Sequence, residues 1–490
     1  MSRPDSLGSR FTVEFVGQLA ATVAGGLLTI LLARLLGPDE YGLLFLAIAV
    51  FGSLGILSKL GIAKSGARYI AEYKERRPEQ IPHIIRTTAW YNLLAIAVVG
   101  TALVVGHRHL ARVIGEPSLT PFLLLGALYL ALEASSTYVR LILQGFEQIK
   151  VSAAVHALDR VSRLAFAVGL VVLGFGALGA LAGYLLSFAF ASAVGIGFLY
   201  VRQYRPLDTG ASIEDGLRRR IGSYTVPLTA TSTANTLDKK VDTILVGFFL
   251  SPVAVSYYVL SKQIVQFVET PMSALGFTLS PTFGAEKASD NIERAARLYE
   301  TSLVYSLLLY VPVGAGIVLV AEPTVSLLVG QEYLGAVPVL QVLAAYAVLQ
   351  AVTNLTSNGL DYLGRARSRA VVKGTTAALN VVLNVLLIPT LGVVGAAIAT
   401  VITYSMYTLA NVYIIHQEFS LRLGYLVRRL VAIGAITGIM ALTVAAVTDY
   451  ITSIPSLLLV VGLGVVVWGA LSVATGLLDI ADVRSTLQHS

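Results

Sequence analysis

Charged side chains interrupt two long apolar stretches in the middle of the chain, 221–250 and 253–279. They are Asp238, Lys239, Lys240, Asp242, Lys262 and Glu269. A charged side chain near the centre of a bilayer costs about 3 kcal/mol, so it is usually kept there for a function or for a partner. Asp242 and Lys262 each lie about 10 residues from Pro252, or roughly 15 Å along a helix, which is near mid-membrane.

A second group of charges lies earlier in the chain. It consists of Glu133 in the stretch 118–142 and of His156, Asp159, Arg160 and Arg163 in the stretch 150–174. Asp159 and Arg163 are spaced i,i+4 and are expected to pair, as are Lys239 and Asp242 at i,i+3. Two interpretations stay open for such residues: ion pairs that join helices, or charges that face a polar cavity.

The excess of cations indicates an anionic ligand. Phosphate or pyrophosphate binds Lys and Arg through charge-assisted hydrogen bonds, which strengthen where the dielectric constant is low. The substrate-binding residues that we expect are Lys239, Lys240, Lys262, Arg160 and Arg163. The carboxylates expected to tune these cations, or to bind a coupling H⁺ or Na⁺, are Asp238, Asp242, Glu133 and Glu269.

Motifs of the common enzyme classes are absent from the sequence. There is no Gly-Lys dipeptide and hence no Walker A loop, no His-Glu-x-x-His, no Gly-x-Ser-x-Gly, no Asp-x-Asp and no cysteine. Gly174-Phe175-Gly176-Ala177-Leu178-Gly179 matches the dinucleotide fingerprint, but it joins two apolar stretches, where small residues allow a tight turn. We therefore expect no enzyme, no catalytic residue, no metal site and no cofactor.

The elements that position these charges are expected to be membrane-spanning helices. The chain of 490 residues is 56% hydrophobic and 13% charged, with a mean hydropathy of +0.77. A spanning helix needs about 20 apolar residues. About 14 such stretches can be drawn: 11–36, 40–62, 84–106, 118–142, 150–174, 177–200, 221–250, 253–279, 297–321, 335–360, 369–390, 392–415, 424–448 and 452–478.

Basic residues are concentrated in every second loop. Segment 63–86 is rich in Lys and Arg, whereas the connections 175–176, 250–252 and 390–392 carry none. The positive-inside rule therefore predicts a multi-pass protein of the cell membrane with both termini in the cytoplasm. The same pattern explains the net charge of +7, so we expect no nucleic-acid partner.

Three short motifs recur in the same order along the chain. Leu36-Gly37-Pro38 matches Leu250-Ser251-Pro252, Gly145-Phe146-Glu147 matches Gly359-Leu360-Asp361, and the glycine turn at 176–180 matches that at 392–396, with offsets of 214 to 216 residues. Duplicated bundles are common in transporters. The predicted domains are an N-terminal six-helix bundle (1–206), a basic cytoplasmic linker (207–220), a C-terminal six-helix bundle (221–418) and an extra helix pair with a cytoplasmic tail (419–490).

The hairpin sequence Leu35-Leu36-Gly37-Pro38-Asp39-Glu40-Tyr41-Gly42-Leu43 resembles the first hairpin of the polysaccharide transporter (Wzx-type) flippases. These belong to the multidrug/oligosaccharidyl-lipid/polysaccharide superfamily. Segment 242–250 resembles the start of that family's second half, and 392–397 resembles its turn between helices 11 and 12. Ser251 and Ser256 stand where the family often has glycine. The resemblance implies an all-α, MATE/MurJ-like fold of two parallel-repeat six-helix bundles plus a C-terminal helix pair.

The resemblance also implies an activity. A flippase of this family would move a polyprenyl- or dolichyl-linked oligosaccharide to the outer leaflet for surface polysaccharide or glycoprotein biosynthesis, by alternating access without ATP hydrolysis. Its partners would be that lipid, the bilayer and the glycosyltransferases or polymerase of the pathway. A cation-coupled multidrug exporter of the same superfamily, typically with 12 helices, is an alternative. A membrane glycosyltransferase or polymerase is another, although the chain has neither a large outward loop nor an acidic catalytic motif.

Overall fold

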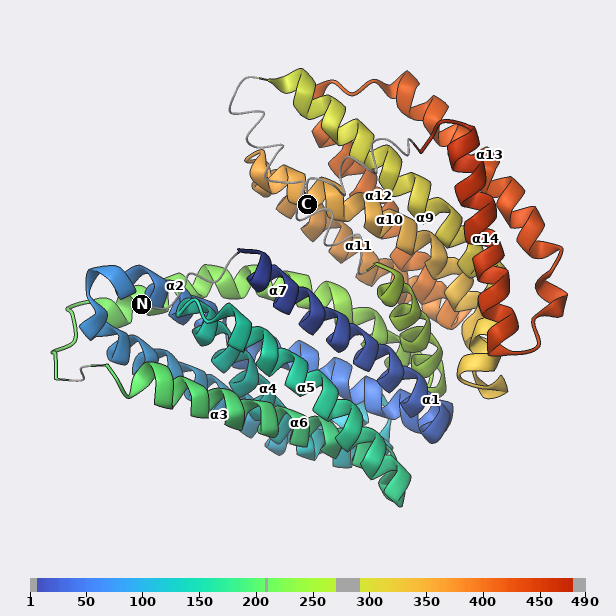
Figure 1. Cartoon of the computed structure of the whole chain (residues 1–490). Helices are drawn as coiled ribbons and strands as arrows, with labels where there is room; N and C mark the ends of the chain where they lie inside the picture. Colours follow the sequence, from blue (N-terminus) through green and yellow to red (C-terminus); the bar gives the residue numbers. More distant parts are fainter. Residues whose placement is uncertain (1–6, 208–209, 270–290, 479–490) are drawn as a thin grey trace. The chain divides into compact units, whose positions relative to one another are not determined.

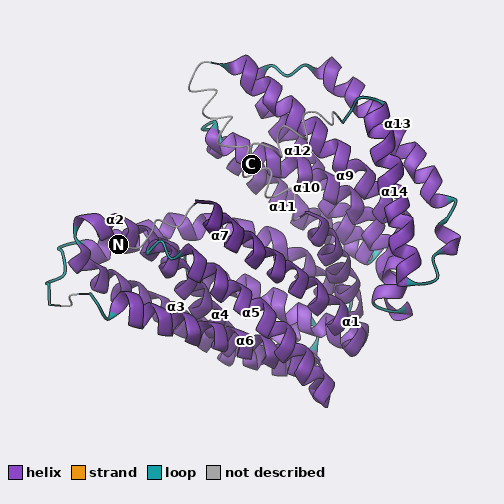
Figure 2. Ribbon diagram, viewed as in Figure 1, coloured by secondary structure: helices purple, strands orange, loops and turns teal. Residues whose placement is uncertain are grey.

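The protein is almost entirely helical in the part of the chain that the structure describes (Figures 1 and 2). The computed structural model describes residues 7–207, 210–269 and 291–478, with only the backbone for 7–20, 227–228 and 230–239. Residues 252–269 are helical, and no β-strand occurs within these ranges. The labelled helices are α1 (Leu7–Lys59), α2 (Ile62–Arg76), α3 (Ile81–Ile114), α4 (Thr120–Gly145), α5 (Ile149–Leu170), α6 (Gly176–Phe198), α7 (Leu217–Phe249), α9 (Ile292–Leu328), α10 (Val337–Tyr362), α11 (Ala366–Leu391), α12 (Val393–Phe419), α13 (Leu423–Ala445) and α14 (Ile454–Ala474).

Ten helical segments among the described residues are long and apolar enough to cross a membrane. Two of them contain a break. Gly37, at φ 70° and ψ 173°, divides α1 at the turn expected before Pro38. Gly174, at φ 91°, separates α5 from α6. The all-α, multi-pass fold is therefore confirmed, whereas the count of 14 spans and the cytoplasmic location of the termini stay predictions.

The glycine turns that were matched as repeats have the same unusual backbone conformation. Gly176 has φ 55° and ψ −148°, and Gly392 has φ 62° and ψ −148°. A side chain would be strained at such positive φ values, so glycine is required at both turns. The sequence match at Gly176 and Gly392 therefore corresponds to the same backbone conformation at the two turns.

The hydrophilic segment 63–83 contains a helix that the sequence prediction did not include. Tyr69, Ile70 and Tyr73 of α2 are buried in a hydrophobic cluster with residues of α3, α4 and α6, while Lys74 and Arg76 are exposed. The apolar residues recur at helical spacing. The high density of charge on the opposite face concealed this helix in a search for apolar stretches.

The structure divides into two compact units, Met1–Ser256 and Tyr257–Ser490. In the first unit α5 packs against α1 and α6, α4 packs against α3 and α6, and α7 packs against α1 and α2. In the second unit α10 packs against α9 and α12, and α13 and α14 cover α9. Trp468 of α14 donates a hydrogen bond to the carbonyl oxygen of Leu308 in α9 at 3.0 Å. The predicted domain boundaries stay a prediction.

The two large basic segments lie at the same end of the first unit. The backbone N–H of Glu214 donates to Oε1 of Gln80 at 2.9 Å, and Gln80 in turn donates to the carbonyl oxygen of Ser212 at 2.8 Å. The Glu214 carboxylate accepts from the Tyr73 hydroxyl at 2.9 Å and pairs with Arg220. The end of the linker is thus bound to α2 and to the start of α3, as the positive-inside pattern requires.

Candidate functional site

A cluster of polar side chains lies in the membrane-spanning part of the first unit. It is formed by α4, α5 and α6, with one lysine from α1. Its members, which we call the arginine cluster, are Lys59, Tyr129, Glu133, Arg140, His156, Asp159, Arg160, Arg163, Tyr184 and Ser187. Helical spacing explains the grouping, because Glu133 and Arg140 are two turns apart on α4 and Asp159 and Arg163 are one turn apart on α5.

The Arg163 guanidinium is held by an ion pair, a hydrogen bond and two aromatic rings. Its Nη2 lies 2.7 Å from each carboxylate oxygen of Asp159, and its Nε donates to Ser187 Oγ at 3.4 Å. The guanidinium carbon lies 4.6 Å from the ring centroids of both Tyr184 and Phe188, within the range of a cation–π interaction. The expected i,i+4 pair is confirmed, and it joins α5 to α6. Its geometry is that of a structural ion pair.

Arg140 and Arg160 differ from Arg163. Neither forms an ion pair within 4 Å of any described carboxylate. Both lie within electrostatic reach of Asp159, whose oxygens are already engaged by Arg163. Arg160 lies roughly 16 Å along α5 from Ile149, well inside the apolar region. Two guanidinium charges therefore remain without a neutralising partner in this part of the described structure.

Three buried polar atoms in the same cluster have no hydrogen-bond partner among the described residues. They are Nε of Arg140, Nδ1 of His156 and Oε2 of Glu133. The other oxygen of Glu133 pairs with Nζ of Lys59 at 2.8 Å. A buried polar atom without a partner is destabilising unless water or a ligand satisfies it. These three atoms therefore mark a place where a polar ligand or water belongs.

The formal charge of the arginine cluster is positive. It holds four cations, Lys59, Arg140, Arg160 and Arg163, against the two carboxylates of Glu133 and Asp159. This excess of positive charge suits an anion that carries up to two charges, because guanidinium groups bind anions through charge-assisted hydrogen bonds. Among the described residues no group of three His, Asp and Glu side chains could hold a metal ion.

Sequence reasoning missed Arg140 and Lys59. Both lie at the predicted ends of spans, where a basic residue is ordinarily assigned to the cytoplasmic loop. Glu133 offered a signal for Arg140, because Arg140 follows it by seven residues and therefore shares its helix face. Extending the polar face of α4 by two turns would have placed Arg140 in the site.

The charges of α7 lie elsewhere in the first unit. The stem of Lys240 packs against Gly52 of α1, where an added Cβ would lie 3.2 Å from the lysine Cε. Asp242 is 2% exposed. Asp238 and Lys239 lie outside the residues whose side chains are described, as does the expected pair of Lys239 with Asp242. Lys240 and Asp242 stay predicted site residues.

The remaining predicted residues, Lys262 and Glu269, belong to the second unit. Nζ of Lys262 lies 3.5 Å from the Tyr258 hydroxyl and 5.2 Å from the centroid of that ring. The Tyr258 hydroxyl also lies 3.1 Å from Thr400 Oγ1 of α12. Glu269 is partly buried at the end of the described helix 252–269. Their roles in binding or coupling stay predictions.

Comparison with known proteins identifies the class. Residues 31–338 match the family described as polysaccharide biosynthesis protein, which is more than half of the chain. The structure is similar to the lipid II flippase MurJ in an inward closed conformation, with a TM-score of 0.78, 14% identity, and coverage of 94% of this chain and 98% of the other. It is also similar to an inward-facing multidrug resistance MATE transporter, with a TM-score of 0.65, 18% identity, and coverage of 81% and 94%.

Two sequence relatives come from the archaeon Haloferax volcanii. The "probable low-salt glycan biosynthesis flippase Agl15" is 22% identical over 393 residues, and the "probable flippase AglR" is 24% identical over 416 residues. Each alignment covers 80% of this chain and 80% of the relative. The chain belongs to the polysaccharide biosynthesis protein family, and the expected membership of the Wzx-type group of flippases in the multidrug/oligosaccharidyl-lipid/polysaccharide superfamily is confirmed.

Proposed function

We propose that the protein is a flippase that moves a polyprenyl- or dolichyl-linked oligosaccharide across the cell membrane for the synthesis of a surface polysaccharide or glycoprotein. Family membership and the names of the archaeal relatives support a role in glycan biosynthesis. The observation that carries the proposal is the arginine cluster, in which Arg140 and Arg160 have no carboxylate partner among the described residues.

The phosphate or pyrophosphate that joins glycan to lipid supplies the missing counter-charge. Burying an unneutralised guanidinium costs several kcal/mol, and an anionic ligand offsets that cost through charge-assisted hydrogen bonds. The lipid tail stays in the hydrocarbon, while the polar head group crosses in contact with such residues. Transport proceeds by alternating access without ATP hydrolysis, and the protein itself forms or breaks no covalent bond.

In this proposal a carboxylate binds the H⁺ or Na⁺ whose movement is coupled to transport. Glu133 is the best placed of them in the first unit, because one of its oxygens pairs with Lys59 and the other lacks a hydrogen-bond partner among the described side chains. A proton or a cation bound there would change the charge of the arginine cluster by one unit. Asp238, Asp242 and Glu269 stay alternatives for this role.

The test is export of the glycan from cells whose own copy of the gene is replaced by Arg140→Gln/Arg160→Gln. We expect loss of glycan export with unchanged abundance in the membrane. Arg108→Gln/Arg112→Gln is the matched control, because it removes two exposed cations from the end of α3 and should leave export intact. Normal export by the Arg140/Arg160 variant would remove the arginine cluster from the substrate path.

The predicted lysines are tested in the same cells. Lys240→Ala/Lys262→Ala should abolish translocation without affecting insertion or abundance, and unimpaired export would remove these two residues from the site. A drug-resistance assay addresses the multidrug alternative. Drug resistance conferred by the chain without any effect on glycan export would reverse the assignment in favour of the exporter.

A further inference from the structure

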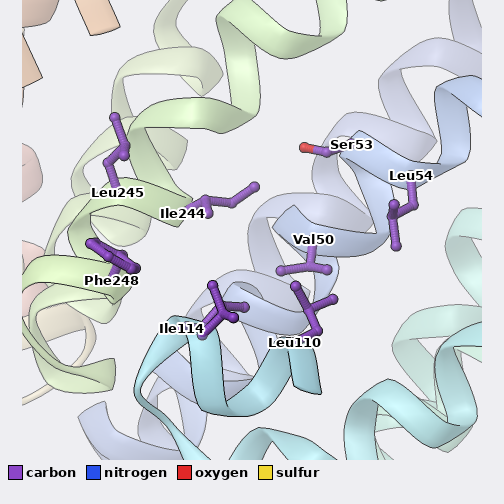
Figure 3. Close-up of a pocket in the computed structure, with 9 residues that line it drawn as sticks. Val50, Ser53, Leu54, Leu110, Ile114, Ile244, Leu245 and Phe248 are labelled. Carbon is purple, nitrogen blue, oxygen red and sulfur yellow. The ribbon is translucent and has the colours of Figure 1, made fainter. Parts of the chain in front are cut away.

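An apolar groove of about 350 Å³ lies in the first unit between α1, α3 and α7 (Figure 3). Its lining is apolar apart from one serine and includes Val50, Ser53, Leu110, Ile114, Ile244 and Phe248. In Figure 3 Ile244 reaches from α7 toward Val50 of α1, with Leu110 and Ile114 of α3 beside Val50. The single hydroxyl in the lining, that of Ser53, is bound to the carbonyl oxygen of Ala49 in its own helix at 3.1 Å. The groove can therefore make apolar contacts with a ligand, but none of its lining side chains has a free hydrogen-bonding group.

A cation marks one end of this groove. Lys240 lies one helical turn before Ile244 on α7, and its stem contacts Gly52, the residue next to Ser53 on α1. Lys240 precedes the lining residues Ile244 and Phe248 on α7, so it lies toward the N-terminal end of this helix from them. Cation and groove together form an amphiphilic surface, with charge at one end and hydrocarbon beyond it.

The position of Lys240 along the membrane normal indicates which kind of lipid phosphate can reach it. Lys240 lies about 14 Å before the last residue of α7, near the middle of the membrane. The phosphate of a resident phospholipid is held at the membrane surface, roughly 15 Å from the centre of a 30 Å hydrocarbon layer. A lipid phosphate reaches Lys240 only if the lipid is being carried across the membrane.

We propose that this groove binds the isoprenoid chain of the lipid carrier while Lys240 binds its phosphate. This inference rests on the proposed function and adds a place and a direction to it. The α3 and α7 ends that line the groove face outward in the orientation predicted by the basic loops. The carrier therefore lies with its phosphate toward the cytoplasm and its chain toward the outside, which is the orientation of a lipid of the cytoplasmic leaflet. The groove therefore holds the substrate early in its transfer, when its phosphate has reached the middle of the membrane but its orientation is still that of the cytoplasmic leaflet.

The groove and Lys240 contribute differently to binding, because the lipid chain leaves a hydrocarbon environment when it enters the groove. Surrounding lipid is as apolar as the groove, so burial of the chain provides little hydrophobic free energy. The affinity comes from the phosphate–lysine contact, and the groove fixes the orientation of the chain. A carrier alcohol without phosphate should therefore bind weakly, and its binding should not depend on Lys240.

The experiment is photocrosslinking of the full chain in lipid vesicles. Three probes carry a photoreactive group in the chain: an isoprenoid phosphate, the corresponding isoprenoid alcohol and a phosphatidylcholine. We expect the isoprenoid phosphate to label α1, α3 and α7 at the groove, at least tenfold more than the other two. Ser53→Trp, which fills the groove, and Lys240→Gln should each reduce this labelling at least tenfold, with partial recovery in Lys240→Arg. Leu459→Trp, on a 74% exposed position of α14, should not reduce it.

Two results would overturn the inference. Equal labelling by phosphatidylcholine would make the groove a site for ordinary acyl chains. Labelling by the isoprenoid phosphate that is confined to helices other than α1, α3 and α7 would place the ligand elsewhere. If Ser53→Trp fails to fold, the labelling of Lys240→Gln compared with that of Lys240→Arg still tests whether the charge at this position binds the phosphate. Failure of the proposed function has a different signature. In that case phosphate-dependent labelling of the groove persists, while the chain translocates no lipid-linked oligosaccharide.

Discussion

Asp159 and Arg163 form a buried ion pair in which one guanidinium nitrogen lies 2.7 Å from both carboxylate oxygens. The two residues are 4% and 6% exposed. Because Arg163 also contacts the rings of Tyr184 and Phe188, the pair is a junction between α5 and α6. This distinguishes Arg163 from Arg160, although the two residues lie three positions apart on the same helix.

The first prediction concerns this junction. Asp159→Asn should lower the stability of the protein in detergent by about 3 kcal/mol or more, because it leaves the Arg163 charge buried without its partner. The double variant Asp159→Asn/Arg163→Met should recover most of that loss, since no uncompensated charge remains. Thermal unfolding of the purified protein measures both. Equal destabilisation by the single and the double variant would show that the pair does not act as a structural unit.

The second prediction concerns the contact of Gly42 with the backbone of Pro252. A Cβ added at Gly42 would collide with the carbonyl group of Pro252. Gly42→Ala should therefore destabilise the protein by about 1–3 kcal/mol, as overpacking does. Gly106→Ala in α3 is the control, because no atom lies within 4 Å of its added Cβ and alanine favours the helix. Thermal unfolding in which the two variants behave alike would mean that the two hairpins are not in firm contact.

The third prediction concerns the attachment of α13 to α9. Glu300 is 1% exposed and accepts from the backbone N–H of Arg422 at 2.6 Å and from its Nε at 2.8 Å. Glu300→Ala should cost about 1.5–3 kcal/mol, because it removes hydrogen bonds to a charged group and leaves a backbone donor without its acceptor. Glu293→Ala breaks the exposed pair with Arg297 and should cost less than about 0.5 kcal/mol. Similar losses of thermal stability in both variants would contradict this assignment.

The fourth prediction is a pH dependence of the linker. Hydrogen bonds from Arg220 and then from Tyr73 hold the pKa of Glu214 below its ordinary value of 4.5. A depressed carboxylate pKa means that the contact contributes its full stability above the ordinary value and loses it as the pH falls through the lower, folded-state pKa. The linker should thus stay bound to α2 at neutral pH and loosen in acid, as the pH falls below the ordinary value of the glutamate pKa.

Amide hydrogen exchange of residues 211–216 measures the loosening of the linker. Glu214→Gln should expose these amides to exchange at neutral pH as well, and the variant should lose the acid-dependent step. Tyr73→Phe removes only one of the hydrogen bonds to the carboxylate and should have an intermediate effect. Unchanged exchange in Glu214→Gln would show that the contacts of Gln80 and His83 hold the linker without the Glu214 carboxylate.

The sequence allowed the all-α, multi-pass fold and the glycine turns to be predicted, because both depend on local composition. Gly37, Gly176 and Gly392 were found because positive φ angles at turns require glycine. The helix α2 was not predicted, because its apolar face is narrow and lies among many charges. The side on which it packs depends on contacts with α3 and α4, which are distant in sequence.

The site could be predicted only in part, because rotation around a helix decides which charge is buried. Arg160 and Arg163 looked equivalent in sequence. The structure directs Arg163 to Asp159 and Ser187, while Arg160 forms no such pair among the described residues. Arg140 lies close to the end of the predicted span 118–142, which suggested a loop residue. Its spacing from Glu133 places it on the polar face of α4, but only the packing of α4 against α5 brings it near Asp159.

In the proposed function Arg140 and Arg160 bind the anionic group of a lipid-linked oligosaccharide during its transfer. The most direct measurement is translocation of a fluorescent lipid-linked oligosaccharide by the purified chain in vesicles, for wild type and Arg140→Gln/Arg160→Gln. We expect transfer by wild type and a rate at least about tenfold lower per arginine removed, with a thermal stability no lower than that of wild type. Transfer at the wild-type rate by the double variant, or no transfer by wild type, would contradict it.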